Sequence, residues 1–247
     1  MCCAHCLRGD AEEADMQKET LRSIFSGLAE IGTLTFTGGE PTLAVERMED
    51  ALAFAKAGNI QVRQVYVVTN GKLVTDRFLR AMTDWNAYCL ERALPFSRKI
   101  RGDRLSWCTK LTKMEDLLGA YVALSADRFH EPIPVGNLAR LCFLPHLVLD
   151  KMVAEEKDDW LLAQGRAADC EMGRILREWE WDERAKRLSI ENNLVDELYI
   201  SVTGDVLKHC DYSYKSQKDF ALEHIGGRDT AWAERLIRSQ KGTDDDE

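Results

Sequence analysis

Three cysteines lie within the first six residues of this chain, and their spacing suits metal or redox chemistry. Cys3 and Cys6 form a C-x-x-C pair, in which two intervening residues let both thiolates converge on one metal. Such a pair binds zinc or an iron–sulfur cluster, or works as a redox dithiol. Zinc needs further soft ligands, and the sequence has no second C-x-x-C; another His/Cys pair, His209-Cys210, lies far along the chain. The cysteines alone therefore leave these chemistries open.

A second motif, Gly38-Gly39-Glu40-Pro41, follows a short segment rich in threonine and phenylalanine. A glycine pair lets the backbone turn sharply and approach a ligand, and the exposed peptide groups there can hydrogen-bond a small polar molecule. The Glu40 carboxylate could meet a cationic amine. A plain strand-to-helix turn with Pro41 at the helix start explains the same four residues. The motif alone therefore does not define a ligand site.

The elements that position these motifs alternate between strand and helix patterns. Apolar residues at helical spacing predict helices at 16–31, 42–57 and 75–92, the first two ended by Gly32 and Gly58. The third helix should turn these side chains inward: Phe78, Met82, Trp85 and Cys89. Short buried runs predict strands at 33–37, 65–69 and 120–125, with 159–163 a weaker candidate. This order predicts a parallel sheet with helical crossovers.

The unusual short motifs all follow predicted strands. They are Gly38-Gly39-Glu40-Pro41, Thr69-Asn70-Gly71, Ser125-Ala126-Asp127 and Gly165-Arg166-Ala167. In parallel α/β barrels the functional residues lie in the loops that follow the strands. We therefore expect these motifs to share one rim of the sheet.

With both motifs considered together, the chain resembles the radical SAM superfamily over roughly residues 1–167. The family signature is C-x3-C-x2-C, commonly with His or an aromatic residue before the last cysteine. The last two-thirds of it are matched by Cys3, His5 and Cys6, and a Gly-Gly-Glu-Pro motif follows after about thirty residues, as in the family. The first signature cysteine would lie upstream of Met1, and the adjacent Cys2 cannot replace it. We expect a truncated chain or a misassigned start codon; the alternative is a degenerate relative that has lost its cluster.

The resemblance implies a partial (β/α) barrel of the radical SAM type, N-terminally truncated. We expect the barrel core at residues 1–195, and a small hairpin extension with an acidic tail at 196–247. The hairpin is predicted from 198–202 and 206–210 around a Thr-Gly-Asp turn. It resembles the cysteine-bearing extensions of some peptide-modifying radical SAM enzymes. Because it contains Cys210 alone, no auxiliary cluster is expected there.

The implied activity is radical chemistry. In the family, three thiolates hold a 4Fe-4S cluster and leave one iron open for the amino and carboxylate groups of S-adenosylmethionine. One electron from the reduced cluster breaks a C–S bond, and the 5′-deoxyadenosyl radical takes a hydrogen atom from the substrate. The substrate would be an unknown small molecule or peptide. The electron donor would be a flavodoxin- or ferredoxin-like protein.

The resemblance also implies roles for individual residues. Iron would be bound by Cys3 and Cys6, with His5 beside the cluster or the adenine. The cofactor's amino group would be received by Gly38, Gly39, Glu40 and Pro41. Other contacts to the ribose or carboxylate would come from Ser125 and Asp127, with Asn70 lining the same cavity. Arg166 would pair with the cofactor carboxylate, and a structural or surface role for it stays open.

Charge and composition limit the function classes. The net charge of −9 disfavours broad nucleic-acid or anionic-membrane binding. The sequence shows neither a signal peptide nor a long apolar run, so we expect a cytoplasmic protein without a membrane partner. Basic residues at 95–113 predict a surface insertion, or a lid over an anionic substrate. Two alternatives to the enzyme are kept: a non-catalytic radical SAM-like accessory or binding protein, and a small zinc-binding protein.

Overall fold

The computed structural model describes most of the chain and divides it into two compact units. The described residues are 6–10, 13–100, 118–125, 129–144, 147–150, 163–173, 175, 177, 180, 188, 190–191, 193–195 and 197–241. We call Ala29–Val153 the sheet unit, and Met1–Leu28 together with Ala154–Glu247 the terminal unit. The boundary predicted after residue 195 falls inside the terminal unit. The N-terminal segment groups with the C-terminal part because its backbone hydrogen-bonds there, through Arg166 N to Cys6 O (3.0 Å) and Tyr214 N to Arg8 O (2.9 Å).

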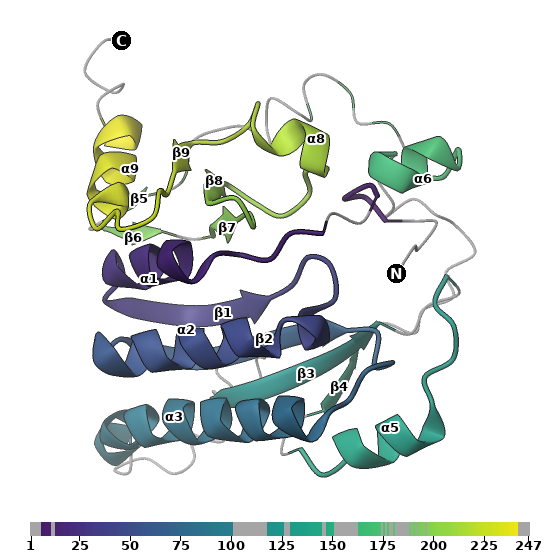
Figure 1. Cartoon of the computed structure of the whole chain (residues 1–247). Helices are drawn as coiled ribbons and strands as arrows, with labels where there is room; N and C mark the ends of the chain where they lie inside the picture. Colours follow the sequence, from purple (N-terminus) through teal and green to yellow (C-terminus); the bar gives the residue numbers. More distant parts are fainter. Residues whose placement is uncertain are drawn as a thin grey trace. The chain divides into compact units, whose positions relative to one another are not determined.

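Four parallel strands form the centre of the sheet unit (Figure 1). They are β1 (Glu30–Phe36), β2 (Gln61–Thr69), β3 (Gly119–Ser125) and β4 (Leu147–Asp150), and they lie in the order β1-β2-β3-β4. Strand order equals chain order, so every crossover steps in the same direction. Barrels are built in this way, whereas doubly wound sheets reverse direction once. In the described part the sheet is open, with β1 and β4 at its edges, so the partial barrel stays a prediction.

Two helices cover one face of this sheet: α2 (Val45–Ala57) and α3 (Asp76–Ile100), which lie side by side in Figure 1. The Trp85 indole on α3 donates to Met48 O on α2 at 3.0 Å. Its ring also packs against Phe36 of β1, with centroids 6.1 Å apart. The inward set predicted for this helix is confirmed, because Phe78, Met82, Trp85 and Cys89 are each at most 2% exposed. Burial of this apolar layer holds the strands in register.

The terminal unit consists of short elements. Its helices are α1 (Lys18–Ser26), α6 (Gly165–Asp169), α8 (Tyr214–Gln217) and α9 (Trp232–Lys241). Its strands are β5 (Ile190–Glu191), β6 (Leu194–Val195), β7 (Tyr199–Ile200), β8 (Asp205–Leu207) and β9 (Glu223–His224). The buried Trp232 donates its indole N–H to Ser23 O at 3.0 Å, which fixes α9 to α1. The predicted hairpin is confirmed as β7–β8, with Tyr199 opposite Leu207.

Several boundaries differ from the predictions. The first helix ends at Ser26 with Gly27 as its C-cap, and not at Gly32, because Glu30 and Ile31 pair with β2. The third helix continues to Ile100, into the region expected to be an irregular basic insertion. The strand candidate at 159–163 lies, apart from Ala163, outside the described residues. Within the described chain, no helix combines the length and the apolar character needed to cross a bilayer.

Candidate functional site at the carboxyl ends of the strands

The Glu40 side chain organises the loop that follows β1. Its Oε1 accepts hydrogen bonds from Thr42 N (3.1 Å), Thr42 Oγ1 (2.8 Å) and Thr69 Oγ1 (2.6 Å). Its Oε2 accepts one from Asn70 N at 3.0 Å. Three of these bonds are to Oε1 and one is to Oε2, and each carboxylate oxygen offers about two lone-pair sites. In this arrangement the carboxylate positions the loop, and Oε2 can still accept a further hydrogen bond.

The backbone of the same loop borders open space. Gly38 has φ +115°, a conformation that favours glycine. A Cβ added at Gly39 would meet no atom within 4 Å. After Glu40, Pro41 starts a 3-10 helix, η1 (Pro41–Leu43), as a proline suits the first turn. Gly39 therefore leaves its peptide groups open to a ligand, while the hydrogen bonds of Glu40 hold the loop in place.

Two sets of hydrogen bonds hold the loop after β2. Asn70 is 9% exposed, and its Oδ1 accepts a bond from Lys72 N at 2.9 Å. Between them, Gly71 has φ +68°, and its carbonyl accepts a bond from Asn137 Nδ2 at 3.0 Å. Asn137 lies on α5 (Val135–Leu141), the helix that follows β3. It therefore links the second and third strand-end loops, a role that the sequence did not signal.

The strand ends bring most of the predicted cofactor residues of this unit to one rim. The carboxyl ends of β1, β2 and β3 lead to Gly38-Gly39-Glu40-Pro41, Asn70 and Ser125 (Figure 1). Ser125 is half-buried and pairs in register with Asp150 of β4. Asp127 lies outside the described residues, as do Cys3 and His5. Lys72, in the loop after β2, forms an ion pair with Glu131, in the loop after β3.

Cys6 and Arg166 lie in the terminal unit, where their backbones meet. The carbonyl of Cys6 accepts hydrogen bonds from Gly9 N at 3.3 Å and Arg166 N at 3.0 Å. The Arg166 guanidinium pairs with Asp10 at 2.9 Å. Between these segments a Cβ at Gly165 would lie 2.3 Å from Gly9 N, so only glycine allows this approach. The predicted residues thus form two groups, one in each unit.

Among the residues that the structure describes, no group of three or more His, Cys, Asp or Glu side chains could hold a metal ion. Cys6 is half-buried, and Cys89 is fully buried. Burial raises the pKa of the Cys89 thiol to about 12, so this cysteine is a neutral part of the core. Of the cysteines that the structure describes, Cys6 stays the candidate iron ligand.

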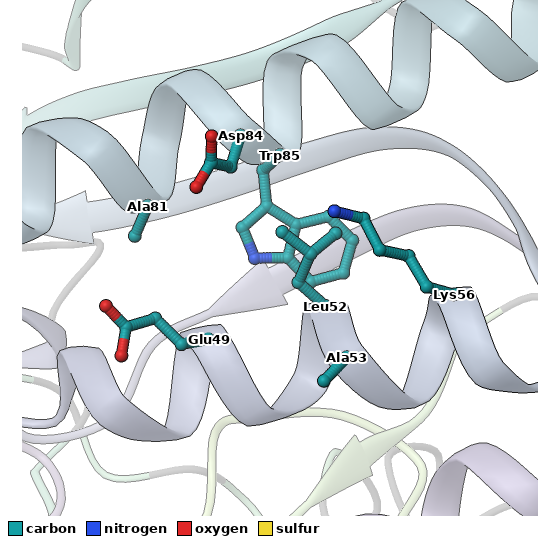
Figure 2. A pocket seen from close by; sticks show the side chains of 7 residues that line it. All are labelled: Glu49, Leu52, Ala53, Lys56, Ala81, Asp84 and Trp85. Carbon is teal, nitrogen blue, oxygen red and sulfur yellow. The ribbon is translucent and has the colours of Figure 1, made fainter.

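A separate hollow of about 260 Å³ lies between α2 and α3 (Figure 2). Its lining residues are Glu49, Leu52, Ala53, Lys56, Ala81, Asp84 and Trp85. Glu49 pairs with Arg77, whose hydrogen bond holds the pKa of that carboxyl below its usual value. The hollow belongs to the helical layer and contains none of the predicted cofactor residues.

Comparison with known proteins adds no relative. No protein-family model matches the chain, and neither the curated proteins nor the solved structures contain a match.

Proposed function

We propose that this protein is a radical SAM enzyme that binds a 4Fe-4S cluster and S-adenosylmethionine and acts on a substrate not yet identified. The observation that carries the proposal is the placement of Gly38-Gly39-Glu40-Pro41. The motif follows β1 of a parallel sheet, at the same rim as Asn70 and Ser125. The cysteine motif precedes it at the family's spacing. Each motif is weak alone, and their order and placement together support the proposal.

The strand-end rim suits the cofactor's methionine moiety. The backbone at Gly39 borders open space, and the buried Asn70 and half-buried Ser125 offer polar atoms along the same rim. Glu40 holds the loop in place, and its Oε2, which accepts one hydrogen bond, would receive the amino group of the cofactor. Cys6 would bind iron together with Cys3. When bound, a reduced cluster supplies the electron that cleaves S-adenosylmethionine.

The order of the parallel sheet supports the proposed barrel. Its four strands follow one another in chain order with α2 and α3 on one face, as they would in a segment of a (β/α) barrel. The opposite face carries polar side chains on β1 and β2, where Thr33 donates to Gln64 at 3.0 Å. Thr33 and Gln64 are register partners on neighbouring strands. This polar face is where we place the substrate.

The test is anaerobic reconstitution of the protein with iron and sulfide, followed by reduction and EPR spectroscopy with and without S-adenosylmethionine. The proposal predicts a reduced 4Fe-4S signal that changes shape when the cofactor is added. A second variant carries an N-terminal extension that completes C-x3-C-x2-C ahead of Cys3, and it should hold more cluster. Cys6→Ser in either background should abolish the signal. If the extended variant holds no cluster, the enzyme proposal fails.

The same samples distinguish the two alternatives. A zinc protein would contain zinc without acid-labile sulfide, and Cys6→Ser would lower its zinc content. A non-catalytic relative would hold neither metal and would still fold, because the hydrogen bonds of Glu40 maintain the strand-end loops without any ligand. Metal and sulfide analysis therefore assigns the protein to one of three classes.

A further inference from the structure

Arg8 is a buried arginine in the terminal unit, two residues after Cys6. It is 7% exposed. Its Nη1 donates to Tyr212 O at 2.8 Å, and its Cζ lies 4.3 Å from the centre of the Tyr199 ring. Its own carbonyl accepts a bond from Tyr214 N at 2.9 Å. The side chain is thus fixed in one place by the segments around β7 and β8.

Within the part of the chain that the structure describes, this guanidinium has no ion-pair partner. A guanidinium has five N–H donors. Across the described residues, Arg8 makes one side-chain hydrogen bond and no ion pair. Other arginines of this unit differ: Arg166 pairs with Asp10, and Arg235 pairs with Asp229 and Glu223. A buried charge without a partner is costly, since the water it loses is not replaced.

Among the described residues, none of its titratable neighbours forms an ion pair with Arg8. Burial raises the pKa of the Cys210 thiol and of the Tyr199 phenol, so both groups are neutral at neutral pH. The carboxylates of Asp211 and Glu197 lie close enough to raise the pKa of Cys210, but neither is paired with Arg8. The Tyr199 ring offers the cation its π face, which compensates only part of the lost hydration.

We propose that Arg8 anchors a carboxylate-binding site in the terminal unit. The planar guanidinium edge matches a carboxylate in a two-bond arrangement, while the Tyr199 ring lies against the guanidinium face. One positive charge balances one carboxylate, whereas a phosphate would call for a second cation. The other guanidinium near Cys6, that of Arg166, is taken by Asp10. Cys6, two residues before Arg8, and Cys210 are half-buried.

This site does not rest on the proposed radical chemistry, because it is argued from the burial and charge of Arg8 alone. It is tested by thermal unfolding of the full chain at pH 7, without iron. Sodium acetate is the probe, compared with sodium chloride at equal ionic strength. The variants are Arg8→Met and Arg8→Lys, with Arg238→Met as the control for the same change at an exposed arginine that pairs with Glu234.

The site predicts that acetate, and not chloride, raises the unfolding temperature of the wild-type protein in a saturable manner. Arg8→Met should weaken the apparent acetate affinity at least about tenfold. Arg8→Lys should weaken it about tenfold, because lysine lacks the planar guanidinium that donates two parallel hydrogen bonds to a carboxylate. Arg238→Met should leave it unchanged. Without acetate, Arg8→Met should unfold at the same or a higher temperature than wild type, because it removes an unpaired buried charge.

Three results would overturn the site. The first is an unfolding temperature that responds equally to acetate and chloride in the wild-type protein. The second is an Arg8→Met protein that unfolds at a lower temperature and keeps the acetate response, which would make Arg8 a structural residue. The third is tighter binding of inorganic phosphate than of acetate by the wild-type protein, with this preference lost in Arg8→Lys. That result would contradict a carboxylate as the ligand. If Arg8→Met does not fold, the comparison of Arg8→Lys with wild type decides.

Discussion

The Glu40 carboxylate accepts a hydrogen bond from the Thr69 hydroxyl at 2.6 Å and thereby joins the end of β2 to the loop after β1. The two residues are 29 positions apart in the chain. Neighbouring strands of a sheet lie only about 4.8 Å apart, so a side chain in the loop after one strand reaches the end of the next. Glu40 is therefore a positioning residue for the Gly38-Gly39 backbone.

Glu40→Gln should weaken this connection. The amide keeps one accepting oxygen and loses the negative charge, so the bonds to Thr42, Thr69 and Asn70 are partly lost. Hydrogen bonds to a charged group contribute about 1.5–3 kcal/mol, and we expect the free energy of unfolding to fall by about 2 kcal/mol. Urea unfolding measures this. Glu91→Gln is the control, since Glu91 is exposed on α3 and makes no recorded contact within the described residues. Equal effects of the two changes would contradict the positioning role.

Gly165→Ala should separate the segment after Cys6 from α6. The added Cβ would lie 2.3 Å from Gly9 N and 2.6 Å from Leu7 O, and the φ of +51° is itself unfavourable for alanine. We expect a loss of at least about 2 kcal/mol in the free energy of unfolding. Iron retained after reconstitution should also fall. Gly136→Ala on α5 is the matched control, because its Cβ would meet no atom within 4 Å. A Gly165→Ala protein as stable as that control would show that this approach is not required.

Cys89 should resist alkylation in the folded protein. Burial raises the pKa of its thiol to about 12, and its side chain is 0% exposed, so the reactive thiolate is absent at pH 8. The exposed Cys142 should react with iodoacetamide within minutes under the same conditions. Mass spectrometry of the labelled peptides distinguishes the two sites. Rapid labelling of Cys89 without denaturant would contradict its place in the core.

The same thiol gives a pH dependence with a definite sign. The folded pKa lies above the unfolded value, so the unfolded state loses its proton first. The contribution of Cys89 to stability is therefore complete below about pH 9 and declines as the pH rises from there towards 12. Cys89→Ala should lose this alkaline decline while losing packing as well. Unfolding free energies measured at pH 8 and pH 10 check the difference.

Asp205 gives an acid dependence of opposite sign. Burial disfavours its ionised form, but hydrogen bonds from Thr203, His224 and Ser201 outweigh burial and lower the pKa of the carboxyl. Its folded pKa thus lies below the unfolded value near 3.8, so its stabilisation is present above that pH and is lost as the pH falls through the folded pKa.

Asp205→Asn should therefore reduce the loss of stability between pH 5 and pH 2, measured by urea unfolding at each pH. The control is Asp219→Asn, a change at an exposed carboxylate in the same unit. An Asp205→Asn protein with the acid dependence of wild type would show that the hydrogen bonds from Ser201, Thr203 and His224 do not stabilise the carboxylate.

The sequence predicted the elements that have a strong local pattern. Strands β1 to β3 are short runs of β-branched, aromatic or aliphatic residues that end at turn motifs, and α2 and α3 repeat apolar residues at helical spacing. It placed a weak fourth strand at 159–163 and did not predict β4, because four residues are too few to show a clear pattern. The two residues of β9 are too few to form a pattern, and β8 alone provides their partner.

The site was predicted less well, for a related reason. Sequence motifs indicated which residues lie at the rim, but not what each side chain contacts. Glu40 was expected to receive an amine, which stays a prediction, and its hydrogen bonds from Thr42, Thr69 and Asn70 were not foreseen. Arg8 gave no signal, because its burial depends on residues about two hundred positions away. Contacts of this range are set by the fold and have no local pattern.

The most direct test of the proposed enzyme is reductive cleavage of S-adenosylmethionine. The reconstituted protein, with and without the extension that completes the cysteine motif, is reduced with dithionite under anaerobic conditions, and 5′-deoxyadenosine is measured by mass spectrometry. We predict 5′-deoxyadenosine and methionine in equal amounts, and none from the Cys6→Ser variant. A protein that holds an intact 4Fe-4S cluster and yet forms no 5′-deoxyadenosine above the Cys6→Ser background would contradict the proposal.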